Sequence, residues 1–386
     1  MKHPLVKDTI NNKDIDELIS WLSKYPRLTK GPITLEFEKK WSEWLGVKNS
    51  IYVNSGSSAN LLMVYSLMIQ NKLKPGDKVV VPAISWATDL SPVIQFGLEP
   101  VLCDCNLEDL SIDLTHFKSI IQKEKPKALI LVSVLGLVPE MKEIVEICKN
   151  NNIILLEDTC ESLGSKYKNK KLGTFGDMST FSLYFGHHIS TIEGGMVCTN
   201  NDELSDIIRS IRNHGWDRDW DEKKQSFYRK KYNVSKFDAL YKFYYPGFNV
   251  RATDLQAKIG LRQLKKLDDV CEIRERNFQT YLSLLKEKNV WLPKNKLDNF
   301  TSNFCFPIIC KNRIELSEHL IKSGVECRPL IAGSMGTQPM YTERYGIKLL
   351  KNAEIINTQG MYIPNNQDMN KKDVEDICNI VCEQIR

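Results

Sequence analysis

The stretch IILLEDTCE, residues 153–161, indicates the fold class of this chain. Four apolar residues make a run as long as a buried strand, and Glu157 and Asp158 end it abruptly. Six similar short runs occur along the chain, at residues 51–54, 79–82, 101–104, 128–135, 178–184 and 195–199. Between them lie amphipathic segments such as 58–70 and 140–150, with apolar residues at intervals of three and four. This alternation predicts an α/β domain with a mostly parallel, seven-stranded sheet.

The length of 386 residues suffices for two domains that share an extensive interface. We expect an N-terminal arm over residues 1–30 and a large cofactor-binding α/β domain over residues 31–250. We interpret a stretch rich in charge and aromatic residues, at about 215–245, as an insertion or lid. A linking helix and a small C-terminal α+β domain should occupy residues 251–386.

Within these regions we predict shorter elements from their periodicity. The arm should hold a helix at 14–22, followed by irregular chain from Pro26 to Pro32. The C-terminal region should hold a helix at 254–278, strands at 303–309 and 325–330, and a closing helix at 371–385.

Composition excludes several classes of protein. The chain is 42% hydrophobic and 26% charged, which indicates a folded protein rather than a disordered one. Its 53 basic and 48 acidic residues are spread along the whole length, so the net charge of +5 marks no surface for nucleic acid. Apolar runs such as 128–137 are much shorter than a membrane span, so we expect no membrane contact.

Eleven cysteines are scattered through the sequence and follow no signal peptide, which favours a reducing, cytoplasmic location. Cys103 and Cys105 flank one aspartate, and Cys378 and Cys382 have helical spacing. Neither pair has a second pair or a histidine nearby, so we favour structural thiols and predict no metal site.

Three features at predicted strand ends are typical of ligand contacts. NSGSSAN, residues 54–60, follows a strand and opens a helix, so its N–H groups and hydroxyls could cradle a phosphate, although an ordinary capped turn has the same pattern. Trp86 lies just past the next strand, where its indole could stack on a flat heterocycle or pack into the core. Asp158, at a strand tip, could hold a cation such as a protonated pyridine nitrogen, or could merely cap the following turn.

The segment FSLYFGHHISTIEGG, residues 181–195, carries two adjacent histidines, His187 and His188. Adjacent side chains do not easily chelate one metal ion, and the remaining four histidines are distant in sequence. A metal site is therefore a poor interpretation of this pair.

In this order, the GSSAN turn, the aromatic residue, the strand ending in Glu-Asp-x-Cys-Glu and the Phe-Ser to Glu-Gly-Gly segment resemble the DegT/DnrJ/EryC1/StrS sugar aminotransferases over nearly the whole chain. In that family the last segment carries the lysine that binds pyridoxal phosphate covalently. Counting from Phe181, or back from Glu193, places His187 at that position. A branch of the family, the pyridoxamine phosphate-dependent 3-dehydratases, shares this histidine.

This branch is also similar to the chain at residues 213–216, 246–251 and 326–329. The resemblance implies the pyridoxal phosphate-dependent transferase fold of aspartate aminotransferase type I. It implies non-covalent pyridoxamine or pyridoxal phosphate, a nucleotide-linked 4-keto-6-deoxy sugar such as GDP-4-keto-6-deoxymannose as substrate, and L-glutamate to regenerate the amine form of the cofactor. A related CDP-linked branch adds cysteines for an iron–sulfur cluster, but none lies between Cys198 and Cys271, so we predict no cluster.

The resemblance also implies roles for individual residues. His187 would be the catalytic base, with an imidazole that titrates near neutrality, and Asp158 would hold the pyridine nitrogen. The remaining expected cofactor residues are Gly56, Ser57, Ser58, Trp86, Glu161, Ser182 and Asn249. Asn249 should reach the cofactor phosphate of a neighbouring subunit, because this family builds its sites across a homodimer. His214, Arg251 and Arg328 are weaker candidates for contacts with substrate or glutamate, and each could instead be a structural surface residue.

Two other functions compete with dehydration. A true sugar aminotransferase could tolerate a histidine at position 187, and an inactive binding protein could retain the fold. An inactive protein would have little reason to keep Asp158, Ser182 and the glycine turn together.

Overall fold

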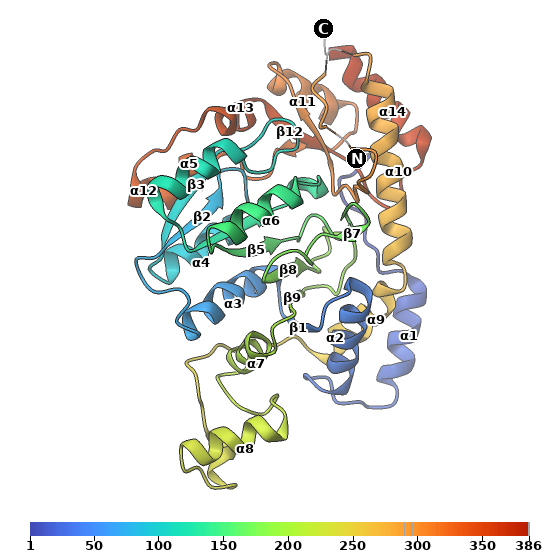
Figure 1. The fold of residues 1–386 in the computed structure, drawn as a ribbon. Helices are drawn as coiled ribbons and strands as arrows, with labels where there is room; N and C mark the ends of the chain where they lie inside the picture. Colours follow the sequence, from blue (N-terminus) through green and yellow to red (C-terminus); the bar gives the residue numbers. More distant parts are fainter. Residues whose placement is uncertain (289, 295, 385–386) are drawn as a thin grey trace.

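The computed structural model describes residues 1–288, 290–294 and 296–384 (Figure 1). At its centre lies a seven-stranded sheet with the order β1-β9-β8-β5-β4-β2-β3. These strands are β1 (Asn49–Val53), β2 (Lys78–Pro82), β3 (Glu99–Cys103), β4 (Ala128–Val132), β5 (Ile154–Asp158), β8 (Met178–Ser182) and β9 (Gly195–Thr199). Six strands run in one direction and β9 is antiparallel to both of its neighbours. The predicted mostly parallel α/β sheet is confirmed.

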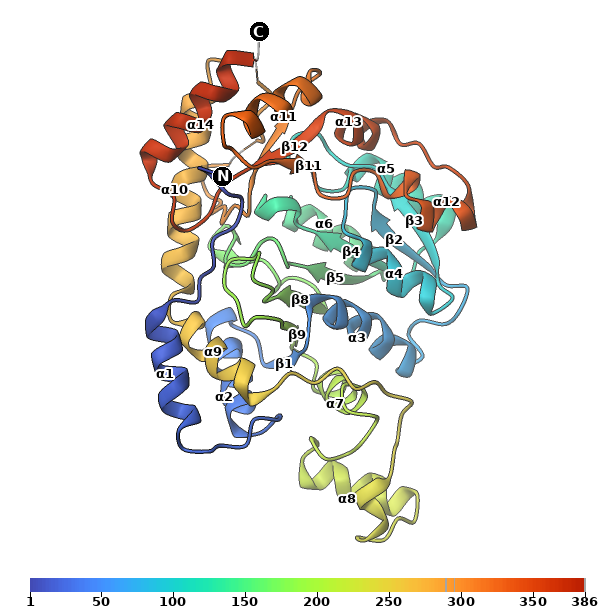
Figure 2. The same cartoon turned by 180° about the vertical axis from the view of Figure 1, so that it is seen from behind.

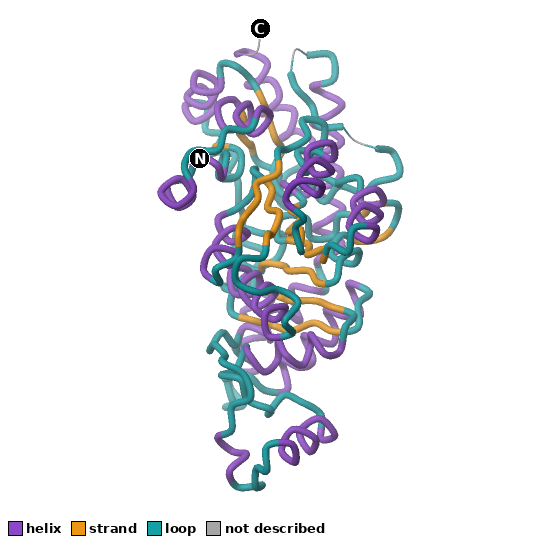
Figure 3. Tube along the Cα trace, turned by 60° about the vertical axis from the view of Figure 1, so that its left-hand side comes forward, coloured by secondary structure: helices purple, strands orange, loops and turns teal. Residues whose placement is uncertain are grey.

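Helices cover both faces of this sheet, as Figures 1 and 3 show. The strands β4, β8 and β9 are buried at every position, which is why they appear in the sequence as unbroken apolar runs. The helices that follow strands of this sheet are α3 (Gly56–Ile69), α4 (Ala87–Gln95), α5 (Leu114–Glu124), α6 (Met141–Asn150) and α7 (Asp202–Ile211). Strand β4 ends earlier than predicted, because residues 134–136 form a 3-10 turn, η1 (Val134–Gly136), in which Leu135 has a positive φ of 52°.

The C-terminal region forms a second, antiparallel sheet with the order β10-β12-β11. Its strands are β10 (Phe306–Ile309), β11 (Arg328–Pro329) and β12 (Gly360–Ile363). The strand predicted over 325–330 is reduced to two residues, because Val325 bridges instead to His3 of the arm. The helices of this region are α11 (Arg313–Lys322), α12 (Pro339–Tyr345), α13 (Lys351–Gln359) and α14 (Lys371–Gln384), with the 3-10 turn η3 (Met335–Thr337). The last residue of the predicted closing helix, Ile385, lies outside the described residues.

The single helix predicted over 254–278 is wrong. The chain forms two helices there, α9 (Asp254–Leu264) and α10 (Leu267–Leu285), separated at Lys265 and Lys266. The break has a packing reason, since α9 packs on α2 (Pro32–Leu45) near the N-terminus, whereas α10 packs on α14. One straight helix could not bury an apolar face against both partners.

The first residues of the chain cross to the C-terminal region (Figure 2). The Leu5 N–H donates to the Glu326 carboxylate at 2.9 Å, beside the bridge between His3 and Val325. Helix α1 (Asn12–Leu22) follows, begun by a capping box between Asn11 and Asp14. A small hairpin of β6 (Lys166–Tyr167) and β7 (Lys170–Lys171) lies elsewhere, between β5 and β8 in sequence.

The aromatic insertion projects from the body below α7 in Figures 1 and 2. It contains α8 (Glu222–Lys231), none of whose residues is buried, and the 3-10 turn η2 (Asp238–Tyr241). Its exposed large side chains are Phe227, Tyr232, Phe237, Leu240, Tyr241 and Phe243. None of the described helices is both long and apolar enough to cross a bilayer.

Candidate active site

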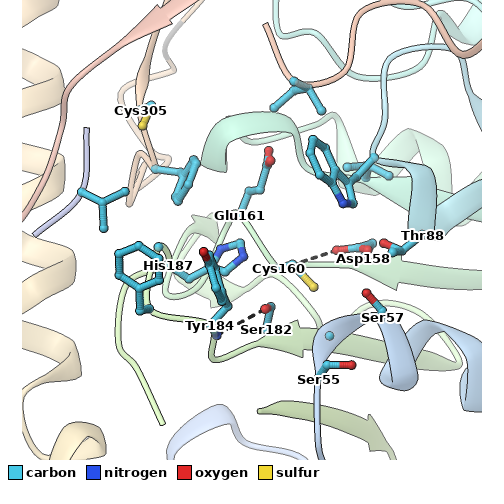
Figure 4. Close-up of a pocket in the computed structure, with 18 of the residues that line it drawn as sticks. Ser55, Ser57, Thr88, Asp158, Cys160, Glu161, Ser182, Tyr184, His187 and Cys305 are labelled. Atoms are coloured by element: carbon cyan, nitrogen blue, oxygen red, sulfur yellow. Dashed lines mark hydrogen bonds between the residues drawn. The ribbon is translucent and has the colours of Figure 1, made fainter. Parts of the chain in front are cut away.

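A cavity of about 550 Å³ opens at one edge of the large sheet, where strands β4, β5 and β8 end (Figure 4). Val132, Asp158 and Ser182, the last residues of these strands, all line it. The carboxyl ends of parallel strands are where ligands of such sheets bind, because the helices that follow each strand start there. Leu5 and Val6 of the arm and Phe304, ahead of β10, complete an apolar wall.

The N-terminus of α3 forms one side of the cavity. Ser55 caps the helix, since its Oγ accepts the Ser58 N–H at 3.0 Å. Ser55, Gly56 and Ser57 line the cavity, but Ser58 does not. Helix N-termini carry partial positive charge, so the hydroxyls of Ser55 and Ser57 surround a place suited to an anion.

Glycines allow Ser182 to approach this helix end closely. A methyl group on Gly56 would lie 2.7 Å from Ser182 Cβ and 3.1 Å from its Oγ. One on Gly195 would lie 2.2 Å from the Ser55 carbonyl oxygen. Only residues without a side chain therefore permit three serine hydroxyls to gather at this helix end.

Asp158 is held by amide donors at the tip of β5. Its Oδ2 accepts a hydrogen bond from Asn60 Nδ2 at 2.6 Å, and its Oδ1 accepts the Cys160 N–H at 2.9 Å. The Asn60 amide oxygen in turn accepts the Thr180 hydroxyl at 2.6 Å, so α3, β5 and β8 are joined at this point. The carboxylate is therefore fixed in orientation at the cavity wall.

Two more acids, Asp89 and Glu161, line the same cavity. Burial and the adjacent Asp158 carboxylate raise the pKa of Asp89 well above its usual range. Burial also raises the pKa of Glu161 to about 8, although its carboxylate accepts the Leu135 N–H at 2.8 Å. In the described part of the chain no lysine or arginine forms an ion pair with Asp89, Asp158 or Glu161, whose donors are amides. Buried carboxyls without a cation favour a ligand that brings positive charge.

His187 faces these acids from the loop between β8 and β9 (Figure 4). Its ring packs at 5.3 Å from the Phe304 ring and 6.4 Å from the Tyr184 ring, and its Nδ1 is buried without a hydrogen-bond partner. Desolvation lowers the pKa of His187 to about 4, against the raising effect of Asp158. Partial burial beside these rings thus shifts the pKa of the imidazole below the near-neutral value that the sequence led us to expect. His188 points elsewhere and contacts the Ser302 carbonyl oxygen at 3.0 Å.

Trp86 and Arg328 also line the cavity. The indole of Trp86 is 55% exposed, so its face is free to stack on a ligand instead of packing into the core. Arg328 bonds Glu326 at 2.9 Å and is largely exposed, so its guanidinium can reorient towards an anion.

Three further predicted residues, Asn249, Arg251 and His214, do not line the cavity of their own chain. Asn249 Oδ1 accepts a hydrogen bond from Arg251 Nε at 3.0 Å. Both residues lie close to the turn that opens α3, since Val53, just ahead of that turn, bridges to Arg251. His214, in a left-handed conformation, packs on Trp216 at 5.1 Å. The insertion is likewise no lid over this cavity, because none of residues 215–245 lines it.

Sequence reasoning missed several residues of the site. Asn60 is part of the quoted GSSAN turn and Asp89 follows Trp86 by three positions, so both could have been suspected from polar residues clustered at strand ends. Leu5, Val6 and Phe304 carry no local signal, because they reach the cavity only through the path of the arm and the second domain.

The sequence model of the DegT/DnrJ/EryC1/StrS aminotransferase family matches residues 9–382 of the chain. A GDP-4-keto-6-deoxy-D-mannose 3-dehydratase of Yersinia pseudotuberculosis is 35% identical over 388 residues, which cover 98% of each chain. A lipopolysaccharide biosynthesis protein of Salmonella typhimurium is 34% identical over 348 residues, 86% of this chain and 79% of that protein. The solved structure of GDP-4-keto-6-deoxy-D-mannose-3-dehydratase from Escherichia coli with bound hydrated PLP has a TM-score of 0.90 at 31% identity, covering 98% of this chain and 99% of that chain.

Proposed function

The chain belongs to the DegT/DnrJ/EryC1/StrS aminotransferase family, and on this basis we propose that it is a dehydratase dependent on pyridoxamine phosphate. It removes the C3 hydroxyl of a nucleotide-linked 4-keto-6-deoxy sugar, with GDP-4-keto-6-deoxy-D-mannose as the first candidate. The observation that carries this proposal is the imidazole of His187 in the cavity, beside Asp158 and Glu161. Imidazole transfers protons, but unlike a lysine amine it does not tether the aldehyde of a B6 cofactor.

The residues of the cavity fit such a cofactor. The hydroxyls of Ser55, Ser57 and Ser182 at the start of α3 suit its phosphate, and the exposed indole of Trp86 suits its ring. The fixed carboxylate of Asp158 suits a protonated pyridine nitrogen. Its donors within the protein are uncharged amides, so the cofactor would bring the positive charge. When bound, pyridoxamine phosphate supplies an amine that reacts with a ketone and a ring that withdraws electrons.

His187 has the properties of the group that moves protons. Its low pKa keeps the imidazole neutral at physiological pH, so it can accept a proton from the reacting carbon. Once protonated in these apolar surroundings it is a stronger acid than free imidazolium. It then donates this proton readily to the departing C3 hydroxyl, which leaves as water.

Other residues of the cavity serve the sugar and the amino donor. Leu5, Val6 and Phe304 form an apolar wall that excludes water and suits a deoxy sugar. L-glutamate restores the amine form of the cofactor, and Arg328 is the cation within the cavity that could bind a glutamate carboxylate or a nucleotide phosphate. We place the product in deoxysugar synthesis for surface lipopolysaccharide or O-antigen, with colitose as one possible end sugar.

We further propose that the working form is a homodimer with shared active sites. Asn249, Arg251 and His214 lie outside the cavity of their own chain, where a second subunit could use them, and Arg251 bridges to Val53 next to the turn that opens α3. The projecting insertion, 215–245, exposes aromatic and basic side chains that a partner could cover. The scattered cysteines of the sequence favour a cytoplasmic location.

The decisive experiment is product analysis. Purified protein, pyridoxamine phosphate, GDP-4-keto-6-deoxy-D-mannose and L-glutamate should yield a 3-deoxy-4-keto sugar and ammonia, detected by mass spectrometry. An amino sugar would support the runner-up, a nucleotide-sugar aminotransferase, which the family description favours. No turnover with any nucleotide-linked keto-sugar of a test panel would support an inactive binding protein.

A further inference from the structure

Asp89 is a buried carboxyl in the cavity to which the proposed chemistry gives no task. It stands in the first turn of α4, where its Oδ2 accepts the Trp86 N–H at 3.2 Å and so caps the start of the helix. Acidic residues in a first helical turn usually keep their charge in water, where the helix end still stabilises it. Asp89 is only 1% exposed and lines the cavity, so capping does not account for its burial.

Asp89 and Asp158 flank the same amide nitrogen. Asn60 Nδ2 lies 2.6 Å from Asp158 Oδ2 and 3.4 Å from Asp89 Oδ1. The other titratable groups near them are Cys160 and Glu161 after β5 and His187 across the cavity. In the part of the chain that the structure describes, neither carboxyl of the pair has a lysine or arginine partner. Two neighbouring carboxyls in such a place cannot both be ionised at little cost, so the protonated form of one of them is favoured.

We propose that Asp89 is a positioning residue that acts through Asp158, so that a carboxyl pair, and not a single aspartate, holds the ring nitrogen of the cofactor in its protonated form. This inference rests on the proposed function. Asp89 keeps its proton while no cation is present, as its raised pKa indicates. With a pyridinium against Asp158, Asp89 can release that proton to solvent as the pH rises. Its negative charge then opposes loss of the proton from the ring nitrogen.

The test replaces Asp89 by asparagine. Asp89→Asn keeps the side-chain size and an oxygen that can accept the Trp86 N–H, but removes the charge. Pyridoxamine phosphate labelled with 15N in the ring is bound to wild type and variant, and the 15N chemical shift is followed with pH in the absence of any sugar. We expect the midpoint for deprotonation of the ring nitrogen to fall in the variant by about one pH unit or more, the size of shift that one nearby charge causes.

Asp113→Asn is the matched control, because Asp113 caps α5 through the His116 N–H at 2.7 Å and does not line the cavity. It removes the same charge and should leave the midpoint unchanged. An unchanged midpoint in Asp89→Asn, or an equal shift in the control, would overturn the role of Asp89 and leave it as a helix cap.

Asp89→Thr provides a second route if the asparagine variant does not fold. Wild type should bind pyridoxamine phosphate at least about tenfold more tightly than an analogue with carbon in place of the ring nitrogen, because that analogue offers the pair no N–H. The ratio should shrink in Asp89→Thr, and an unchanged ratio contradicts the inference. Wild-type product analysis stays independent of both measurements, so a 3-deoxy product with an unshifted midpoint would reject the carboxyl pair alone.

Discussion

Asn60 Nδ2 lies 2.6 Å from Asp158 Oδ2, and this hydrogen bond joins the first turn of α3 to the tip of β5. The Asn60 amide oxygen accepts a hydrogen bond from the Thr180 hydroxyl of β8 at 2.6 Å. One side chain thus joins the three elements that present the serine hydroxyls at the start of α3, the buried carboxylate and the loop of His187.

Replacing Asn60 by alanine should lower both stability and cofactor affinity. The change leaves the Asp158 carboxylate and the Thr180 hydroxyl short of a partner in a buried place, which costs about 1–3 kcal/mol. Urea unfolding of the cofactor-free protein measures the first effect, and fluorescence titration with pyridoxamine phosphate the second. Thr180→Val removes only the hydrogen bond from Thr180 to the Asn60 amide oxygen, so it should destabilise the protein but change cofactor affinity less than Asn60→Ala does. Equal cofactor affinity in Asn60→Ala and wild type would contradict this view.

Replacing His187 by asparagine should abolish dehydration while cofactor still binds. Asparagine fills a similar space but cannot carry a proton, so we expect a loss of at least about 100-fold in kcat, the usual contribution of acid–base catalysis. Product formation and cofactor binding are measured on the same preparation. Borohydride treatment of wild type with pyridoxal phosphate should attach no cofactor to the chain. A covalent adduct with a lysine, or an active His187→Asn variant, would place the proton transfer elsewhere.

The low pKa of His187 predicts an acid-sensitive stability. In the unfolded chain this imidazole titrates near 6.5, and in the cofactor-free folded protein near 4, so protons favour the unfolded state between these values. The folding stability that depends on the neutral imidazole is fully present above about pH 6.5 and is lost as the pH falls towards 4. Between pH 7 and pH 5, wild type should lose about 2 kcal/mol more unfolding free energy than His187→Asn. Parallel losses in the two proteins would show that the imidazole is protonated in the folded state.

The close approach of Gly56 and Ser182 predicts a rescue experiment. Gly56→Ala should weaken phosphate binding by about tenfold or more, because its methyl group would press on Ser182 Cβ at 2.7 Å and displace the helix end. Adding Ser182→Gly removes the obstructing atom. The double variant should regain thermal stability but not affinity for the cofactor, because one phosphate-facing hydroxyl is now missing. Recovery of full affinity would argue against a role for Ser182 in the site.

The shared-site proposal predicts complementation between two defective proteins. Arg251→Ala should impair activity although Arg251 does not line the cavity of its own chain. If Arg251 serves the neighbouring subunit, a mixture of Arg251→Ala and His187→Asn contains mixed dimers with one intact site. Refolding the two variants together at equal amounts should restore about a quarter of wild-type activity, as random pairing in a two-fold dimer requires. Analytical ultracentrifugation checks that the mixture is dimeric. No recovery of activity would show that Arg251 does not serve the site of the neighbouring subunit.

Much of the fold could be predicted from the sequence because its signals are local. Seven apolar runs predicted the seven strands of the large sheet, and the strand end at Asp158 predicted where the cavity opens. The helix over 254–278 was predicted wrongly, since its break at Lys265 and Lys266 depends on which distant helices cover each half. Likewise, nothing local in the insertion shows that it projects away from the cavity.

The sequence by itself determined the alternation of strands and helices, the serine and glycine turn before α3, and the histidine at position 187, because each is written in the order and type of consecutive residues. Only the tertiary structure decided that Asp89 and Asp158 flank one amide, that partial burial lowers the pKa of His187, and that Leu5 and Phe304 wall the same cavity. The physical reason is that desolvation and charge coupling depend on distance in space. Groups far apart in the chain acquire these properties only when the sheet, the arm and the second domain come together.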